Sequence, residues 1–174
     1  GRPDSHAINP LAAIRPNSAE APEQCAEIAA RIVPATKTND PFWENMSRRL
    51  LSGTLLFLAT YAPEPMRNLT TLRLIWSCGE ERLSEVLAMM MLCPDYGGLI
   101  RDSAKAYASA PDKTRTSMLT CVQEPLSFLN SQRAEASLKG DEIDYDAFLR
   151  GEAMTIYLRV PPQYGRGQEA LLLN

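Results

Sequence analysis

The sequence of 174 residues contains one histidine, His6, and its four cysteines form no C-x-x-C pair. Ser-His and Cys-His nucleophilic sites need a histidine beside the nucleophile, and a zinc site needs several His or Cys ligands close together. One histidine near the beginning of the sequence excludes both kinds of site unless another chain completes them. The scattered cysteines lie in apolar patterns and are expected to be buried, reduced thiols.

The sequence also lacks the phosphate-binding loop G-x-x-x-x-G-K-[ST] and the dinucleotide-binding pattern G-x-G-x-x-G. Its longest apolar run, residues 50–60, is shorter than the about 20 residues that a helix needs to cross a bilayer. We therefore expect a soluble chain with no enzymatic activity of its own, no cofactor within it and no direct insertion into a membrane.

The charge of the chain is nearly balanced. Eighteen Lys and Arg residues stand against 21 Asp and Glu residues, which gives a formal net charge of -3 and a pI of about 5.3. Proteins that grip nucleic acid across their whole surface are normally basic, so any DNA contact must be local. The hydrophobic content of 45% and the length fit one globular domain with a substantial core.

The clearest pattern that is present predicts a helix over residues 40–61. Asp40 suits the N-cap and Pro41 the first helical position. Apolar residues then recur at spacings of three and four, and from Leu50 onward they surround the helix, which places it in the middle of a bundle. The adjacent aromatics could line a binding surface or a pocket, but their helical phase favours the core. The predicted core anchors are Phe42, Trp43, Met46, Leu50 and Phe57.

Shorter helical patterns surround this one, separated by proline and glycine. They cover residues 18–33, 69–78, 80–93, 97–110, 112–130 and 132–138, with a brief helix within 141–151. Asn68 is a candidate cap, and Pro125 should kink or split its helix. The predicted fold class is mainly α, a compact bundle of about six to eight helices spanning 18–150, with an extended lead-in over 1–17.

The pattern changes after residue 150. The segment MTIYLRV, residues 154–160, alternates apolar and polar side chains and predicts one short β-strand. A lone strand leaves its backbone groups unpaired, and only the lead-in around Ala7 and Ile8 offers a partner within the chain. We therefore expect that residues 151–174 form a strand and loop belonging to a sheet outside this sequence.

Several basic residues lie on predicted helix faces or at helix starts, where they could contact phosphates or an acidic partner. Scattered, solvated charge is the alternative interpretation. Arg48 and Arg49 are adjacent on the best-defined helix and form the first pair to test. The full set of candidate partner or DNA contacts is Arg48, Arg49, Arg101, Lys105, Lys113 and Arg115.

Three segments together resemble landmarks of the type IV secretion coupling proteins, the conjugative DNA-transfer ATPases of the TraG/TraD kind. They are INPLAAI at 8–14, NDPFWENMSRRLLSGTLLFL at 39–58 and MTIYLRVPP at 154–162. In that family an Asn-Pro-Leu segment leaves the nucleotide-binding domain, a helical insertion follows, and a strand returns to the central sheet. Order and spacing agree over nearly the whole chain.

The resemblance implies that residues 18–150 are the all-alpha domain and that 1–17 and 151–174 are flanks of the nucleotide-binding domain. It implies a full-length, hexameric ATPase anchored in the bacterial inner membrane and using ATP and Mg²⁺. The Walker A and Walker B motifs would lie outside this sequence, so no catalytic residue is carried over. The all-alpha domain would stand on the cytoplasmic side, facing incoming cargo.

Two functions follow from this resemblance. The leading hypothesis is a non-enzymatic domain that docks a relaxase–DNA complex (the relaxosome) or secreted effector proteins for delivery to the secretion channel. The alternative is an element that guides single-stranded DNA at the mouth of the hexamer, or a purely structural helical domain.

Overall fold

The computed structural model describes residues 6–35, 41–140, 142–144, 147, 150–155 and 157. All the elements of more than one residue in this part of the chain are helices, which confirms the predicted, mainly α bundle. The α-helices are α1 (Ala21–Ile32), α2 (Phe42–Tyr61), α3 (Leu69–Ser77), α4 (Glu80–Met91), α5 (Leu99–Ala108), α6 (Asp112–Gln123) and α7 (Gln132–Leu138). Three short 3-10 helices join them: η1 (Glu64–Met66), η2 (Tyr96–Gly98) and η3 (Pro125–Asn130).

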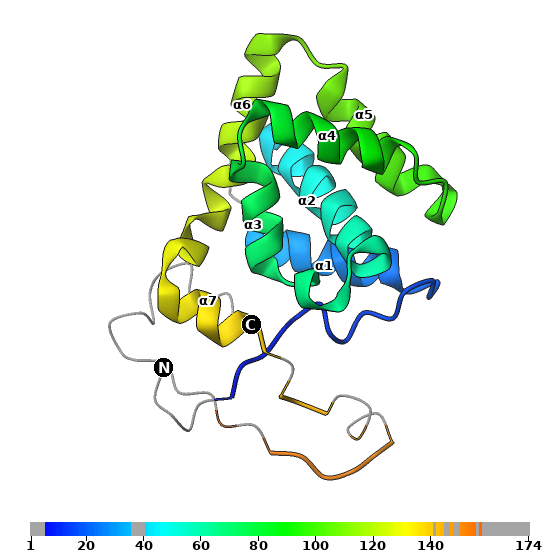
Figure 1. The fold of residues 1–174 in the computed structure, drawn as a ribbon, viewed down its shortest axis with the longest axis vertical. Helices are drawn as coiled ribbons and strands as arrows, with labels where there is room; N and C mark the ends of the chain where they lie inside the picture. The colour runs from blue at the N-terminus through cyan, green and yellow to red at the C-terminus, as the bar shows by residue number, and fades with distance from the viewer. Residues whose placement is uncertain are drawn as a thin grey trace.

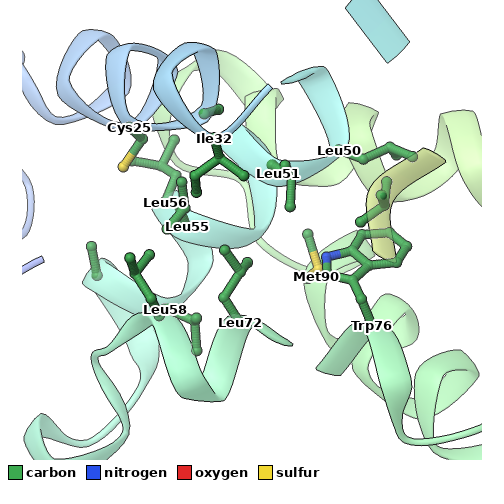
Figure 2. Close-up of a cluster of buried hydrophobic side chains, with 14 of the residues drawn as sticks. Cys25, Ile32, Leu50, Leu51, Leu55, Leu56, Leu58, Leu72, Trp76 and Met90 are labelled. Atoms are coloured by element: carbon green, nitrogen blue, oxygen red, sulfur yellow. The ribbon is translucent and has the colours of Figure 1, made fainter. Parts of the chain in front are cut away.

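Helix α2 is the centre of the bundle (Figure 1). It packs against α1, α3, α5 and α6, while α4 covers α5 and α3 from outside. Figure 2 shows its leucines between Cys25 and Ile32 of α1 and the side chains of Leu72 and Trp76 from α3. The prediction that α2 runs through the middle is confirmed. Its buried residues are Ser47, Leu50, Leu51, Gly53, Thr54, Leu55, Leu56, Leu58 and Ala59.

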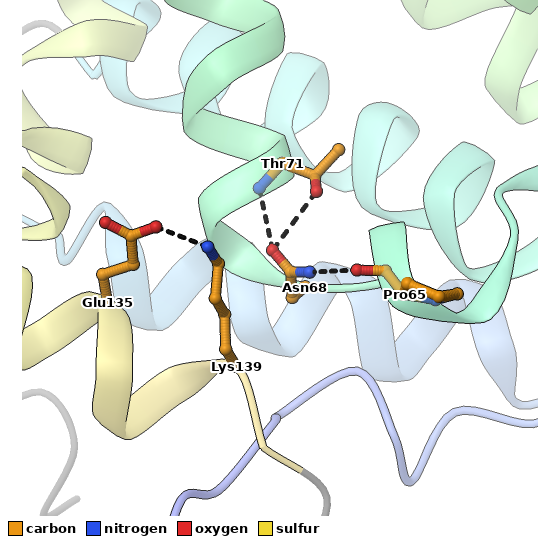
Figure 3. Close-up of polar contacts among 5 residues, drawn as sticks. All are labelled: Pro65, Asn68, Thr71, Glu135 and Lys139. Carbon is orange, nitrogen blue, oxygen red and sulfur yellow. Dashed lines mark hydrogen bonds and ion pairs between the residues drawn. The ribbon is translucent and has the colours of Figure 1, made fainter.

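Two predicted boundary signals act as expected. The Asn68 side chain caps α3 by accepting a hydrogen bond from the Thr71 N–H at 2.9 Å, and its amide donates to the Pro65 carbonyl at 2.9 Å (Figure 3). Pro125 splits its helix, since α6 ends at Gln123 and η3 begins at the proline. The cap satisfies a backbone donor that the first turn of a helix otherwise leaves open.

The first turn of α2 differs from the prediction. Phe42 is 47% exposed and Trp43 37% exposed, so the prediction that they anchor the core is wrong. The physical reason is that burial on α2 begins only at Ser47, whose hydroxyl donates to the Trp43 carbonyl at 2.8 Å. The side of the first turn that carries Phe42 and Trp43 is uncovered, and the two rings pack edge to face at 5.0 Å. Leu50 is fully buried, whereas Met46 and Phe57 are partly buried against the core.

The lead-in is bound to the bundle rather than standing apart from it. Leu11 and Ile14 are buried in the core. The buried Asn9 side chain donates to the Arg67 carbonyl at 2.6 Å and accepts from the Leu11 N–H at 3.1 Å. The asparagine of the Asn-Pro-Leu segment thus ties the lead-in to the connection between α2 and α3.

The lead-in also runs beside the end of α7. The Ile8 N–H donates to the Ser137 carbonyl at 2.8 Å, and the Ala7 N–H donates to the Glu142 carboxylate at 3.2 Å. A Cβ on Gly140 would fall 2.4 Å from the Cβ of Ala7, so only glycine permits this approach. The segment entering the bundle and the segment leaving it are therefore neighbours.

Some predictions fall largely on residues that lie outside the described part of the chain. These are the Asp40 cap, part of the helix within 141–151 and most of the strand at 154–160. Within 141–151, Ala147 is helical, and its N–H donates to the Asp144 carboxylate at 2.8 Å. The strand and the boundaries of the flanks at 17/18 and 150/151 stay predictions.

Candidate functional site

The candidate contacts are brought together in part by the close approach of α2 and α5. A Cβ on Gly53 of α2 would lie 1.9 Å from the Ser103 Oγ of α5, so a glycine is required for the two helices to come this near. One turn earlier on α2, the Arg49 guanidinium reaches across and donates to the Asp102 carbonyl at 3.1 Å. Gly53 therefore allows the close helix contact across which Arg49 reaches α5 at the surface.

Three cations meet around the carboxylate of Asp102. Arg101 donates through Nε to Asp102 Oδ1 at 2.9 Å, and the charges of Lys105 and Arg49 act on the same carboxylate. The pKa of Asp102 is lowered first by the hydrogen bond from Arg101 and then by the positive charges of Arg101, Lys105 and Arg49. Arg49, Arg101 and Lys105 form what we call the basic cluster, which carries two formal positive charges in excess of its carboxylate.

Arg48 does not share this surface with its neighbour Arg49. Its Nε donates to the Val33 carbonyl at 2.8 Å, just after the end of α1, and its Nη2 lies 4.0 Å from the Glu44 carboxylate. The side chain is only 26% exposed. The structure therefore places Arg48 in the α1–α2 junction, and the two arginines point to different elements.

Lys113 and Arg115 lie at the start of α6, apart from the basic cluster. Arg115 pairs with the Asp112 carboxylate at 2.5 Å, whereas Lys113 is exposed. Arg115 also approaches Tyr107 of α5, whose pKa is raised chiefly by burial. Of the six predicted contact residues, three form the basic cluster. Arg48 holds the α1–α2 junction, and Lys113 and Arg115 lie apart at the start of α6.

A hollow that no sequence pattern predicts lies between α3, α6 and η3. It has a volume of about 230 Å³. One signal was available: Arg73 is the only charged residue within α3. The lining residues are Arg73, Ser77, Gln123, Leu126, Ser127 and Asn130.

The cysteines and the carboxylates of the described residues offer no second kind of site. The described cysteines are free thiols, and burial raises the pKa of Cys25 to about 12. No group of three or more His, Cys, Asp or Glu among the described residues could hold a metal ion. None of the described helices is long and apolar enough to span a bilayer.

Comparison with protein families gives one match of nearly full length. The family described as type IV secretory system conjugative DNA transfer matches residues 2–173. Neither the curated proteins nor the solved structures gave a match.

Proposed function

The chain belongs to the type IV secretory system conjugative DNA transfer family, and on this premise we propose that its helical bundle is the all-alpha domain that docks cargo. The cargo is a relaxase–DNA complex or a secreted effector protein. The domain works on the cytoplasmic side of the inner membrane, as part of a longer, hexameric ATPase. Its role is to bind rather than to catalyse, which is supported by the lack of a phosphate-binding loop in the sequence.

The observation that carries this proposal is the basic cluster. Arg49 and Lys105 are exposed, and Arg101 is partly exposed, on the same side of α2 and α5. The side chains of Arg49 and Arg101 are held by hydrogen bonds to Asp102, so less of their side-chain entropy is lost when a partner binds. An excess of positive charge speeds encounter with an acidic surface and fixes its orientation.

The direct test compares two double variants that remove the same charge. Arg49→Ala/Lys105→Ala removes two cations of the cluster, and Arg82→Ala/Arg133→Ala removes two exposed cations from α4 and α7. Calorimetry with the cognate relaxase or effector should show binding weakened at least about tenfold in the first variant only. Equal losses in both variants, or no loss in either, would contradict docking through the cluster.

A second function, guidance of single-stranded DNA, is favoured by the same excess of positive charge. Each neutralised phosphate of a single strand contributes about -0.7 to the slope of log affinity against log salt. Removing Arg49 and Lys105 should therefore make that slope shallower by about 1.4. Fluorescence anisotropy with an oligonucleotide measures this slope. An unchanged slope would exclude DNA from the cluster, and failure of both cargo and DNA to bind would leave a purely structural domain.

A further inference from the structure

The short helix η2, between α4 and α5, has an unusual backbone. Of the described residues other than glycine, only Asn17 and Tyr96 have a positive φ, and that of Tyr96 is 53°. Gly97 and Gly98 follow with φ of 65° and 87°. Glycine adopts such angles without a steric penalty, whereas for a bulky residue they are unfavourable. A strained residue persists where its surroundings hold it, so the shape of η2 depends on the contacts of Tyr96.

The phenol of Tyr96 is held by two other segments of the chain. The Asn17 N–H donates to its oxygen at 2.8 Å, and the same oxygen lies 3.3 Å from Thr60 Oγ1 near the end of α2. Thr60 donates its only hydroxyl proton to the Leu56 carbonyl at 2.7 Å. The Tyr96 O–H therefore donates to Thr60 while it accepts from Asn17. One hydroxyl thus joins the lead-in, α2 and η2.

Asn17 belongs to the turn that connects the lead-in with α1. The Ser18 N–H donates to the Arg15 carbonyl at 3.2 Å, which closes a four-residue turn. Pro16 at its second position and the φ of 63° at Asn17, its third, fit a type II turn. The bond that closes the turn uses the Ser18 N–H, and the Asn17 N–H goes to Tyr96. A displacement of this turn therefore moves the donor to which the phenol is bonded.

The other end of η2 positions Arg101 of the basic cluster. Gly98 immediately precedes α5, and a Cβ on it would collide with the Arg101 guanidinium. The guanidinium therefore lies close over the Gly98 backbone, and its Nε donates to Asp102 Oδ1 at 2.9 Å. Because Gly98 provides the space for the guanidinium, a change in the backbone angles of η2 would displace Arg101 from Asp102.

Two arrangements of η2 follow from these contacts. With the phenol bonded to Asn17 and Thr60, Tyr96 keeps its positive φ. Without these bonds nothing offsets the steric cost, and a negative φ has the lower free energy. An element with two arrangements is what coupling between separate parts of a protein requires.

We propose that Tyr96 is a conformational switch that couples the position of the lead-in to the geometry of the basic cluster. While its phenol is bonded to Asn17 and Thr60, η2 stays left-handed and Arg101 stays beside Asp102. When the lead-in moves, these bonds break, the backbone of Tyr96 relaxes and Arg101 leaves Asp102. This coupling concerns the shape of the cluster and does not depend on which partner the cluster binds.

NMR of the whole chain follows both ends of the switch. Hydrogen exchange of the Asn17 amide reports its bond to the phenol. The pKa of Asp102, followed by the ¹³C signal of its carboxyl group, reports the contact with Arg101, whose hydrogen bond is the main cause of the lowered pKa. Tyr96→Phe should speed exchange at Asn17 several-fold and raise the pKa of Asp102 toward its ordinary value. The control Tyr107→Phe removes the hydroxyl of a tyrosine within α5 and should change neither.

Substitution of Asn17 tests the coupling from the side of the lead-in. Asn17→Pro removes the N–H that the phenol accepts and does not fit a positive φ, so it should raise the pKa of Asp102 as Tyr96→Phe does. Asn17→Gly keeps the N–H and suits the turn, so the pKa of Asp102 should stay that of the parent.

Two results would overturn the proposal. One is unchanged exchange at Asn17 in Tyr96→Phe. The other is a pKa of Asp102 that stays constant in Tyr96→Phe while exchange at Asn17 rises, since the phenol would then hold the lead-in without any effect on the cluster. Tyr96→Phe keeps the ring and decides alone if Asn17→Pro does not fold. If Asn17→Pro folds, an unchanged pKa of Asp102 in that variant also contradicts the coupling.

Discussion

The first turn of α2 and the rest of the helix follow the same spacing of apolar residues but have different surroundings. From the middle of the helix onward, Leu51 and Leu55 are wholly buried. In the first turn, Phe42 and Trp43 begin lines of apolar residues at spacings of three and four, yet they are exposed. The difference shows that helical phase determines the direction of a side chain, whereas neighbouring elements determine whether it is covered.

The largest effect should come from the buried part of α2. Leu51→Ala should lower the free energy of unfolding by about 2–5 kcal/mol, because it leaves a cavity in the centre of the bundle. Urea denaturation followed by circular dichroism measures this change. The paired variant Leu92→Ala, at a residue that is 83% exposed, should change stability by less than about 0.5 kcal/mol. Similar costs for the two variants would contradict the burial described for α2.

Gly53→Ala should have the next largest effect. The added methyl group would fall 1.9 Å from Ser103 Oγ and 2.5 Å from Ser103 Cβ, so α2 and α5 must separate. Overpacking of this kind costs about 1–3 kcal/mol. The separation should also loosen the contact of Arg49 with Asp102, seen as increased mobility of the Arg49 side chain by NMR. A stability equal to or above that of the parent would show that the helices are not in close contact.

Arg48 and Arg49 allow a comparison of a covered and an exposed side chain at the point on α2 where burial begins. Arg48→Ala should cost about 1–2 kcal/mol, because the Val33 carbonyl loses a charged donor that is partly buried. Arg49→Ala, at an exposed position, should cost less than about 0.5 kcal/mol. Thermal denaturation of both variants measures the difference. A larger cost for Arg49 than for Arg48 would reverse the roles assigned to these neighbours.

A smaller loss than that of Arg48→Ala is expected in the first turn of α2. Trp43→Ala should cost about 0.5–1.5 kcal/mol, the scale of an aromatic pair, because its edge-to-face contact with Phe42 is lost. A fully buried tryptophan would cost about 3–5 kcal/mol. Chemical denaturation distinguishes these ranges. A loss of about 3–5 kcal/mol in the free energy of unfolding would show that Trp43 is buried.

The sequence was sufficient to predict the features that depend on neighbours along the chain. The stripe of α2, the Asn68 cap and the split at Pro125 each rest on residues within a few positions of one another. The exposure of Trp43 was not predictable in this way, because it depends on how far α1 and α5 extend along α2.

For the candidate sites, too, the sequence predicts single exposed residues but not which of them come together. Exposed basic positions such as Arg49 and Lys105 could be named from helix faces, but their convergence depends on the packing of α2 on α5. The partner of Arg48 is a carbonyl 15 residues away, across the α1–α2 connection. The hydrogen bond of Arg73 to Asn130 joins residues 57 positions apart, and no local pattern contains both.

The neighbouring positions of the entering and leaving segments have a mechanical consequence. A force applied between residue 7 and residue 142 would separate the two adjacent chain segments, starting at one end. The first bonds to yield would be the contact of Ala7 with Glu142 and then that of Ile8 with Ser137. Such peeling breaks hydrogen bonds one after another, while the leucines around α2 carry little load. Tension between these two segments would therefore break these hydrogen bonds before it reached the core.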